Sequence, residues 1–142
     1  MSDSHQLAAY AHGLAFEDLP PDVVEQAKLL TLHVIGVSLA GRQTKQGSDA
    51  VRLALEMGGD CAEATLWGER RRVSASQAAF ANGTLADVLD WEDCSWTGHP
   101  SAGAIPAAFA AAERAGASGR DYLTAIVAGY EVYQRIAMAV QP

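Results

Sequence analysis

Residues 21–41 read PDVVEQAKLLTLHVIGVSLAG, and this stretch decides the expected fold. Pro21 suits the first turn of a helix, because proline lacks the amide hydrogen that the first turn leaves unpaired. Apolar residues then recur at helical spacing until Gly41: Val24, Ala27, Leu30, Val34 and Ile35. The stretch predicts a long helix at the centre of the domain.

The rest of the chain predicts five more helices. Alanines are numerous, and Pro and Gly fall mostly between apolar-periodic runs, which favours helices over sheet. Ser74 with Gln77 and Ser118 with Asp121 have the spacing of capping boxes. Residues 64–67 are the best strand candidate, although so short a run could be an extended connection. The helices are expected over residues 4–12, 47–57, 74–89, 101–116 and from 118 onward.

Length and charge restrict the class of protein. A chain of 142 residues predicts one domain, here an all-α, multi-helix domain over residues 1–142. Ten Lys and Arg against seventeen Asp and Glu give a net charge of −7, which argues against a nucleic-acid partner or an anionic membrane surface.

No export or membrane signal is expected. The first residues lack a basic segment followed by an apolar one, and no stretch is expected to stay apolar for the roughly 20 residues that a membrane span needs. Cys61 and Cys94 fit neither a disulfide framework nor a CxxC metal motif. We therefore expect a soluble, cytoplasmic protein with two reduced thiols.

Candidate catalytic groups gather between the fourth and fifth helices. Residues 90–101 read DWEDCSWTGHPS and place three acids and one histidine in a single loop. An imidazole titrates near neutral pH, and a carboxylate beside it can exchange protons with it. Asp90 and His99 are the predicted catalytic pair.

Two other interpretations of the loop stay open. In the structural one, Asp93 or Ser101 caps a helix, Trp91 and Trp96 pack against the core, and His99 is a hydrogen-bonding group. In the other, oxygen and imidazole groups bind a divalent ion, although two histidines at helical spacing are missing. The ligands would be Asp90, Glu92, Asp93 and His99.

Polar residues elsewhere have simpler expected roles. Residues 69–72, Glu-Arg-Arg-Arg, could bind a carboxylate or form a solvated turn. His33 is expected to be a satisfied core histidine, and neither cysteine has a partner that would make it a nucleophile.

The chain resembles the MmgE/PrpD family, which includes 2-methylcitrate dehydratase, cis-aconitate decarboxylase and iminodisuccinate epimerase. The resemblance runs in the family's order from about Phe16 onward. It is carried first by AAFANGTLADVLD at 78–90 and GHPSA at 98–102. Further agreement lies at 35–41, 64–68, 116–120 and 123–132.

The resemblance implies a fold, a chemistry and a site. Family members join an all-helical domain to a smaller α+β domain, act on carboxylate-rich substrates by proton transfer, and typically use no metal or organic cofactor. The site aspartate and histidine of the family correspond to Asp90 and His99 here. The resemblance does not say which of them takes which role.

Departures from the family concern the same loop and the length. Asp87 stands where the family often has histidine, His33 where it has aspartate, and Cys94 where it has threonine. Family members continue well beyond the position of Pro142 and contribute further histidine and lysine, so the second α+β domain is expected to be absent from this chain.

Two functions remain open at this stage. The first is a lyase or isomerase subunit for a small polycarboxylate, acting in a homo- or hetero-oligomer with a chain that supplies the second domain. The second is a non-catalytic binding or assembly module with the same fold.

Overall fold

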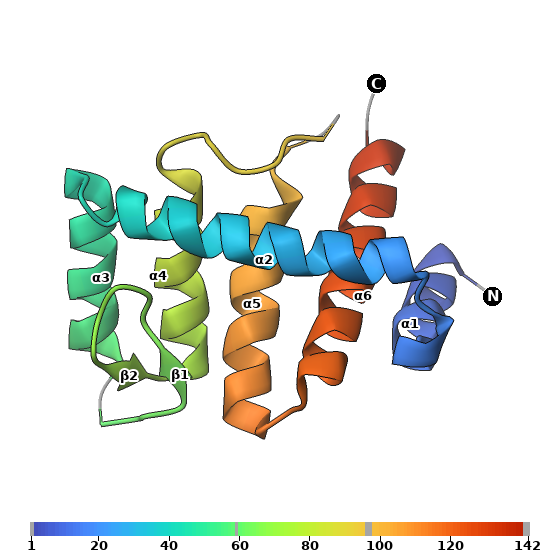
Figure 1. The fold of residues 1–142 in the computed structure, drawn as a ribbon, viewed down its shortest axis with the longest axis horizontal. Helices are drawn as coiled ribbons and strands as arrows, with labels where there is room; N and C mark the ends of the chain where they lie inside the picture. The colour runs from blue at the N-terminus through green and yellow to red at the C-terminus, as the bar shows by residue number, and fades with distance from the viewer. Residues whose placement is uncertain (1, 59, 96–97, 141–142) are drawn as a thin grey trace.

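The computed structural model describes residues 2–58, 60–95 and 98–140 (Figure 1). Within these residues the chain is mostly helical, as the sequence predicts. The elements are α1 (Asp3–Gly13), the short 3-10 helix η1 (Phe16–Asp18), α2 (Pro21–Gly41), α3 (Lys45–Met57), β1 (Ala64–Thr65), β2 (Arg72–Val73), α4 (Ala75–Asp87), α5 (Pro100–Ala115) and α6 (Gly119–Ala139).

Helices α3 to α6 stand side by side, and α2 lies across them (Figure 1). α2 begins at Pro21 and ends at Gly41, as predicted, and buries Val24, Ala27 and Val34. At Gly41 the backbone passes so close to α4 that an added Cβ would collide with the carbonyl oxygen of Leu85. Only glycine permits this crossing.

α2 is also the one described helix that is long and apolar enough to cross a membrane, with a mean hydropathy of 1.3. The expectation that no stretch has this character is therefore wrong. The helix nevertheless contacts α4, α5 and α6 along its length. In this arrangement 22% of its most apolar stretch is buried.

The core consists of two clusters of buried apolar side chains. One joins α3, α4, α5 and the hairpin around Val51, Leu66 and Leu85. The other joins α2, α5 and α6 around Val34, Ile105 and Ile126. The two clusters fix α4 and α5, the helices on either side of the candidate loop.

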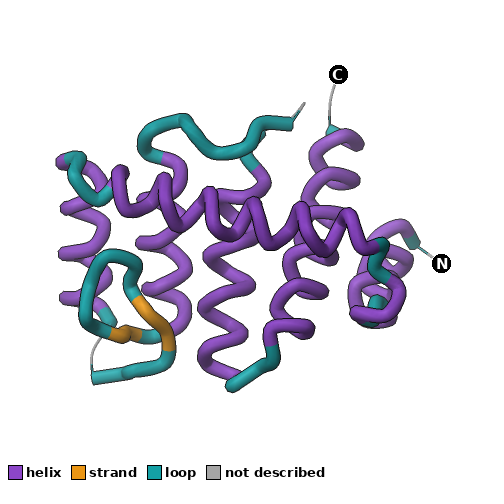
Figure 2. The backbone as a smooth tube through the Cα atoms, in the orientation of Figure 1, coloured by secondary structure: helices purple, strands orange, loops and turns teal. Residues whose placement is uncertain are grey.

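The strand candidate is confirmed only in its first half. Ala64 pairs with Val73 and Thr65 with Arg72, which makes a two-residue antiparallel hairpin (Figure 2). Leu66 and Trp67 continue as buried connection and not as strand. The intervening arginines Arg70 and Arg71 are exposed, as a solvated turn requires.

The two capping predictions have opposite outcomes. Ser118 and Asp121 form the expected capping box at the start of α6. Ser74 precedes α4 as predicted, but its side chain caps nothing. Instead, the Ala75 amide donates to Glu63 Oε2 at 2.9 Å, because the hairpin brings this carboxylate to the helix end.

Candidate active site

The candidate site lies in the long loop that joins α4 to α5. After α4, Asp90 adopts a left-handed backbone with φ of 55°, which few residues other than glycine adopt readily. The loop ends at His99, the residue before Pro100, and Pro100 opens α5. Asp90 and His99 thus lie at the two ends of the loop.

His99 lies between two carboxyl groups. Its Nε2 is 3.5 Å from Asp90 Oδ1, and its Nδ1 is 2.9 Å from Glu92 Oε1. The Asp90 side chain is 84% exposed, whereas that of Glu92 is fully buried. The structure therefore brings together the two residues that the sequence singles out and adds Glu92 on the other edge of the ring.

The buried carboxyl group of Glu92 has a raised pKa. Burial raises its pKa, and the neighbouring Asp87 carboxyl raises it further, while the charge of a protonated His99 opposes the rise. Neither Glu92 oxygen has a hydrogen-bond partner of acceptable geometry among the described residues. The 2.9 Å approach of His99 is close enough, but the orientation of the groups is not that of a hydrogen bond.

Asp93 has a structural role and is not beside the His99 ring. Its Oδ1 accepts the Ser101 amide at 3.1 Å, which caps α5, and its Oδ2 accepts the Tyr130 hydroxyl of α6 at 3.0 Å. Burial, and then the charge of Asp93, raises the pKa of Tyr130. The structural interpretation is therefore correct for Asp93.

Two further contacts hold the loop against the bundle. His33 of α2 contacts the Trp91 carbonyl oxygen through Nε2 at 2.9 Å. Gly98, with φ of 141°, lies so close to α6 that an added Cβ would be 2.5 Å from the Tyr133 hydroxyl. The sequence predicted a core position for His33 and, in the structural interpretation, packing of Trp91 against the core. Both predictions are wrong, because both residues are exposed.

An open pocket of about 560 Å³ lies beside this loop. His99 and Asp87 line it from the loop and the end of α4, and Phe80 and Tyr133 line it from α4 and α6. Among the described residues, the lining of this pocket includes no lysine or arginine. A carboxylate substrate bound here would need cations from outside this lining.

Glu69, Cys61 and Cys94 are not among the residues that line this pocket. Arg42, the residue after α2, donates to Glu69 at 2.8 Å, so this acid of the charged run is already paired. Cys61 and Cys94 are free and exposed. Trp96, expected in the core, lies outside the described residues.

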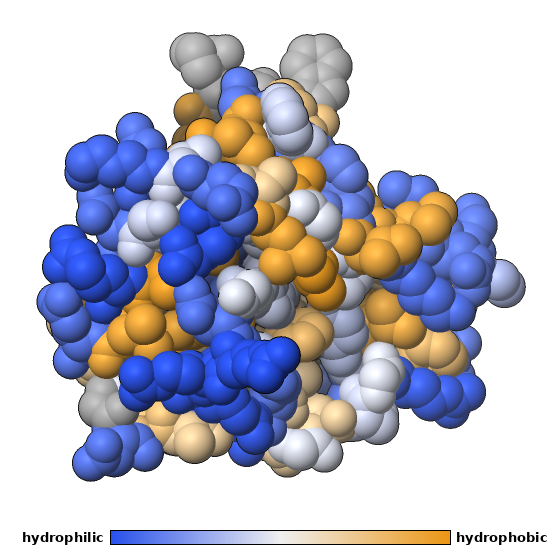
Figure 3. Space-filling view, turned by 60° about the vertical axis from the view of Figure 1, so that its left-hand side comes forward, coloured by the Kyte–Doolittle hydropathy of each residue, from blue (hydrophilic) through white to orange (hydrophobic). Residues whose placement is uncertain are grey.

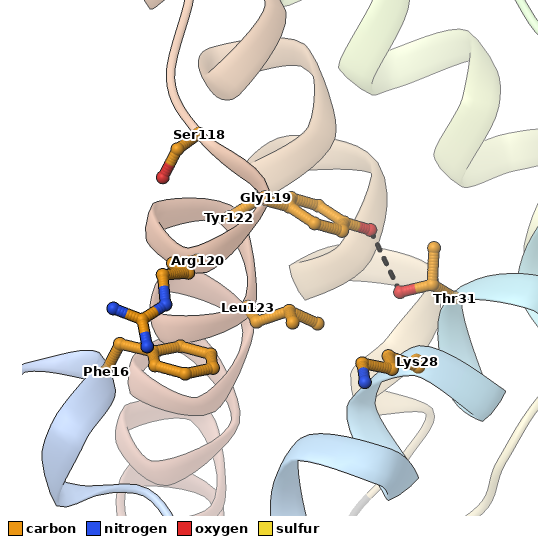
Figure 4. A pocket seen from close by; sticks show the side chains of 8 residues that line it. All are labelled: Phe16, Lys28, Thr31, Ser118, Gly119, Arg120, Tyr122 and Leu123. Carbon is orange, nitrogen blue, oxygen red and sulfur yellow. Dashed lines mark hydrogen bonds between the residues drawn. The ribbon is translucent and has the colours of Figure 1, made fainter.

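A second pocket, of about 600 Å³, lies between η1, α2 and α6 (Figure 4). Its two cations are engaged by neighbouring acids, Lys28 by Glu25 at 2.6 Å and Arg120 by Glu17 at 2.7 Å. Arg120 also stacks over the Phe16 ring. This pocket therefore offers no free charged group for chemistry.

Sequence reasoning found the loop but not its full chemistry. The burial of Glu92 and its approach to Asp87 require α4 and the loop to be placed in space. The signal available was the aspartate at position 87, which departs from the resembled family. Tyr130 and Tyr133 gave no signal, because an aromatic residue at helical spacing usually belongs to the core.

The fold and the site define an all-helical domain that presents an aspartate–histidine loop at the end of two central helices. The chain matches the MmgE/PrpD N-terminal domain over residues 5–142. It belongs to the MmgE/PrpD family.

The chain is similar to proteins that are named cis-aconitate decarboxylase or cis-aconitate decarboxylase-like protein. A cis-aconitate decarboxylase-like protein of Aspergillus oryzae, oryM, is 30% identical over 95% of this chain and 30% of its own length. The human cis-aconitate decarboxylase is 29% identical and that of Aspergillus terreus 26%, each over 95% of this chain and 29% of its own length. The chain thus spans less than a third of these relatives.

Proposed function

We propose that this chain is part of a lyase or isomerase that acts by proton transfer on a small polycarboxylate. The reaction is a dehydration, decarboxylation or epimerisation, and Asp90 and His99 act as acid–base or substrate-orienting groups. The observation that carries the proposal is the 3.5 Å approach of His99 Nε2 to Asp90 Oδ1 beside an open pocket. The decarboxylase relatives support the same class of chemistry.

We further propose that a second polypeptide or domain completes the site. The described pocket lining has one carboxylate, that of Asp87, but no lysine or arginine, so the cations that would hold an anionic substrate must come from elsewhere. Large apolar side chains are also exposed, including Phe80 at the pocket, 53% exposed, and Leu29 and Leu32 on α2. Figure 3 shows such apolar patches among the polar surface. Exposed apolar patches are typical of surfaces that another polypeptide covers.

The cytoplasm is the proposed compartment. Cys61 and Cys94 are both free and exposed, and such thiols persist in a reducing environment.

The test combines purification and activity. Partners that co-purify with the full chain are identified, and proton exchange, dehydration and decarboxylation are measured on cis-aconitate and methylcitrate-like acids. Asp90→Asn and His99→Gln are each expected to lower the rate by about 10²-fold or more, because each removes an acid–base group. Asp60→Asn and His12→Gln, which alter exposed residues outside the site, are matched controls.

Full activity in both Asp90→Asn and His99→Gln would remove their proposed roles. A complex that assembles but is inactive on all these acids would favour the non-catalytic assembly module.

A further inference from the structure

Glu92 is buried beside His99, whose Nδ1 is 2.9 Å from its Oε1. Its side chain is fully buried, and neither carboxylate oxygen has a hydrogen-bond partner among the described residues. His99 Nδ1 is also buried and lacks such a partner. A buried carboxylate whose oxygens accept no hydrogen bond is costly, so natural proteins neutralise it with a proton, a cationic side chain or a metal ion.

The groups around Glu92 have the composition of a metal site. Asp87 from the end of α4, Glu92 from the loop and His99 from the start of α5 each offer one ligand atom, and these atoms lie within 4.8 Å of one another. None of the described lysine or arginine ion pairs involves Asp87 or Glu92.

We propose that Asp87, Glu92 and His99 bind a divalent transition-metal ion such as Mn²⁺ or Zn²⁺. Two carboxylate oxygens and one imidazole nitrogen suit these ions, which accept mixed oxygen and nitrogen ligands. The ligand set differs from that considered from the sequence alone, since Asp87 joins and Asp93 caps α5 instead.

The position of the site gives the ion further ligands. Asp87 and His99 also line the open pocket, so the side of the ion facing it is accessible to water or to a carboxylate. The ion would also place a positive charge where the lining has none. The proposal concerns binding alone, and with the ion bound His99 keeps the substrate-orienting role proposed above but not the acid–base one.

The experiment measures metal binding by the full chain after treatment with a chelator. Mn²⁺ is titrated and the free ion followed by its paramagnetic resonance signal, with Zn²⁺ as competitor. We expect one saturable site that Zn²⁺ displaces. Asp87→Asn, Glu92→Gln and His99→Gln are each expected to weaken binding at least tenfold, while the exposed control Asp60→Asn binds as the parent does.

Circular dichroism identifies which variants are folded, and any one folded ligand variant is sufficient for the test. A folded ligand variant that binds Mn²⁺ as tightly as the parent would overturn the proposal, as would the absence of saturable binding at millimolar Mn²⁺. Co²⁺ gives an independent readout, because its visible absorption must change in His99→Gln if the imidazole is a ligand. An unchanged spectrum would exclude His99 as a ligand. None of these readouts requires activity, so a failure here leaves the proposed reaction standing.

Discussion

The two connections at opposite ends of α5 are built in different ways (Figures 1 and 2). The short α5–α6 connection is closed by its own residues: Gly116 has a left-handed φ of 61°, and Ser118 and Asp121 cap α6 reciprocally. The α4–α5 loop has local bonds as well, between Ser95 and Gly98 and from the Ser101 amide to Asp93, but it is also bonded to residues distant in sequence on α2 and α6. A connection that only turns the chain needs local rules, whereas a loop that presents chemistry needs support from the rest of the fold.

The largest expected effect is on the contact between the candidate loop and α6. Gly98→Ala is expected to lower the free energy of unfolding by about 3 kcal/mol, because the new Cβ meets the Tyr133 hydroxyl at a backbone angle unsuited to alanine. Chemical denaturation measures the change.

Two variants sharpen this test. Gly98→Ala combined with Tyr133→Phe is expected to recover part of the loss, because the hydroxyl is the atom that the Cβ approaches. Gly103→Ala, within α5 and with open space around it, is the control and is not expected to destabilise. If Gly98→Ala unfolds like the parent, the loop does not depend on this contact.

A smaller loss is expected when Asp93 is removed. Asp93→Ala should cost about 2 kcal/mol, since it loses a helix cap of about 1 kcal/mol and a hydrogen bond to Tyr130 of about 1 kcal/mol. Tyr130→Phe removes only the second contact and should cost about half as much. Equal losses in the two variants would mean that the cap contributes nothing. Denaturation curves provide both values.

The local connection should be less sensitive to a single substitution. Ser118→Ala is expected to cost about 1 kcal/mol, the usual contribution of a helix cap. Ser74→Ala replaces the same residue type at the equivalent position of α4, where no capping bond exists, and should cost less. A larger loss for Ser74→Ala in thermal melting would contradict the difference between these two helix starts.

The last prediction concerns how the free energy of unfolding depends on pH. A carboxyl group whose folded-state pKa lies above its unfolded value binds its proton more tightly in the folded state. Glu92 has such a raised pKa through burial and Asp87, against the opposing charge of His99. The ordinary pKa of a glutamate is 4.5. As the pH rises from that value through the folded-state pKa of Glu92, the contribution of Glu92 to the free energy of unfolding should therefore fall.

Glu92→Gln should flatten this dependence when a chelator is present. Denaturation at several pH values from acid to neutral, on parent and variant, measures the slope. The exposed control Asp60→Asn should leave the slope unchanged. Parallel curves for parent and Glu92→Gln would show that the raised pKa of Glu92 does not affect folding.

The sequence by itself determined the helices and the position of the candidate loop. Proline at the first turn of α2, helical spacing of its apolar residues and the Ser118 capping box all act within a few residues, so local patterns predicted them correctly. The same patterns could not say that Ser74 would remain without a capping bond, because Glu63 reaches that helix end only when the hairpin packs there.

Only the tertiary structure decided the surroundings of each side chain in the loop. Asp90 and Glu92 are two residues apart, yet one is exposed and the other buried against His99. That difference comes from how α4, α5 and α6 meet, and not from the residue types. Burial and proximity are properties of packed elements, so the chemistry of Glu92 could be recognised only after the fold was known.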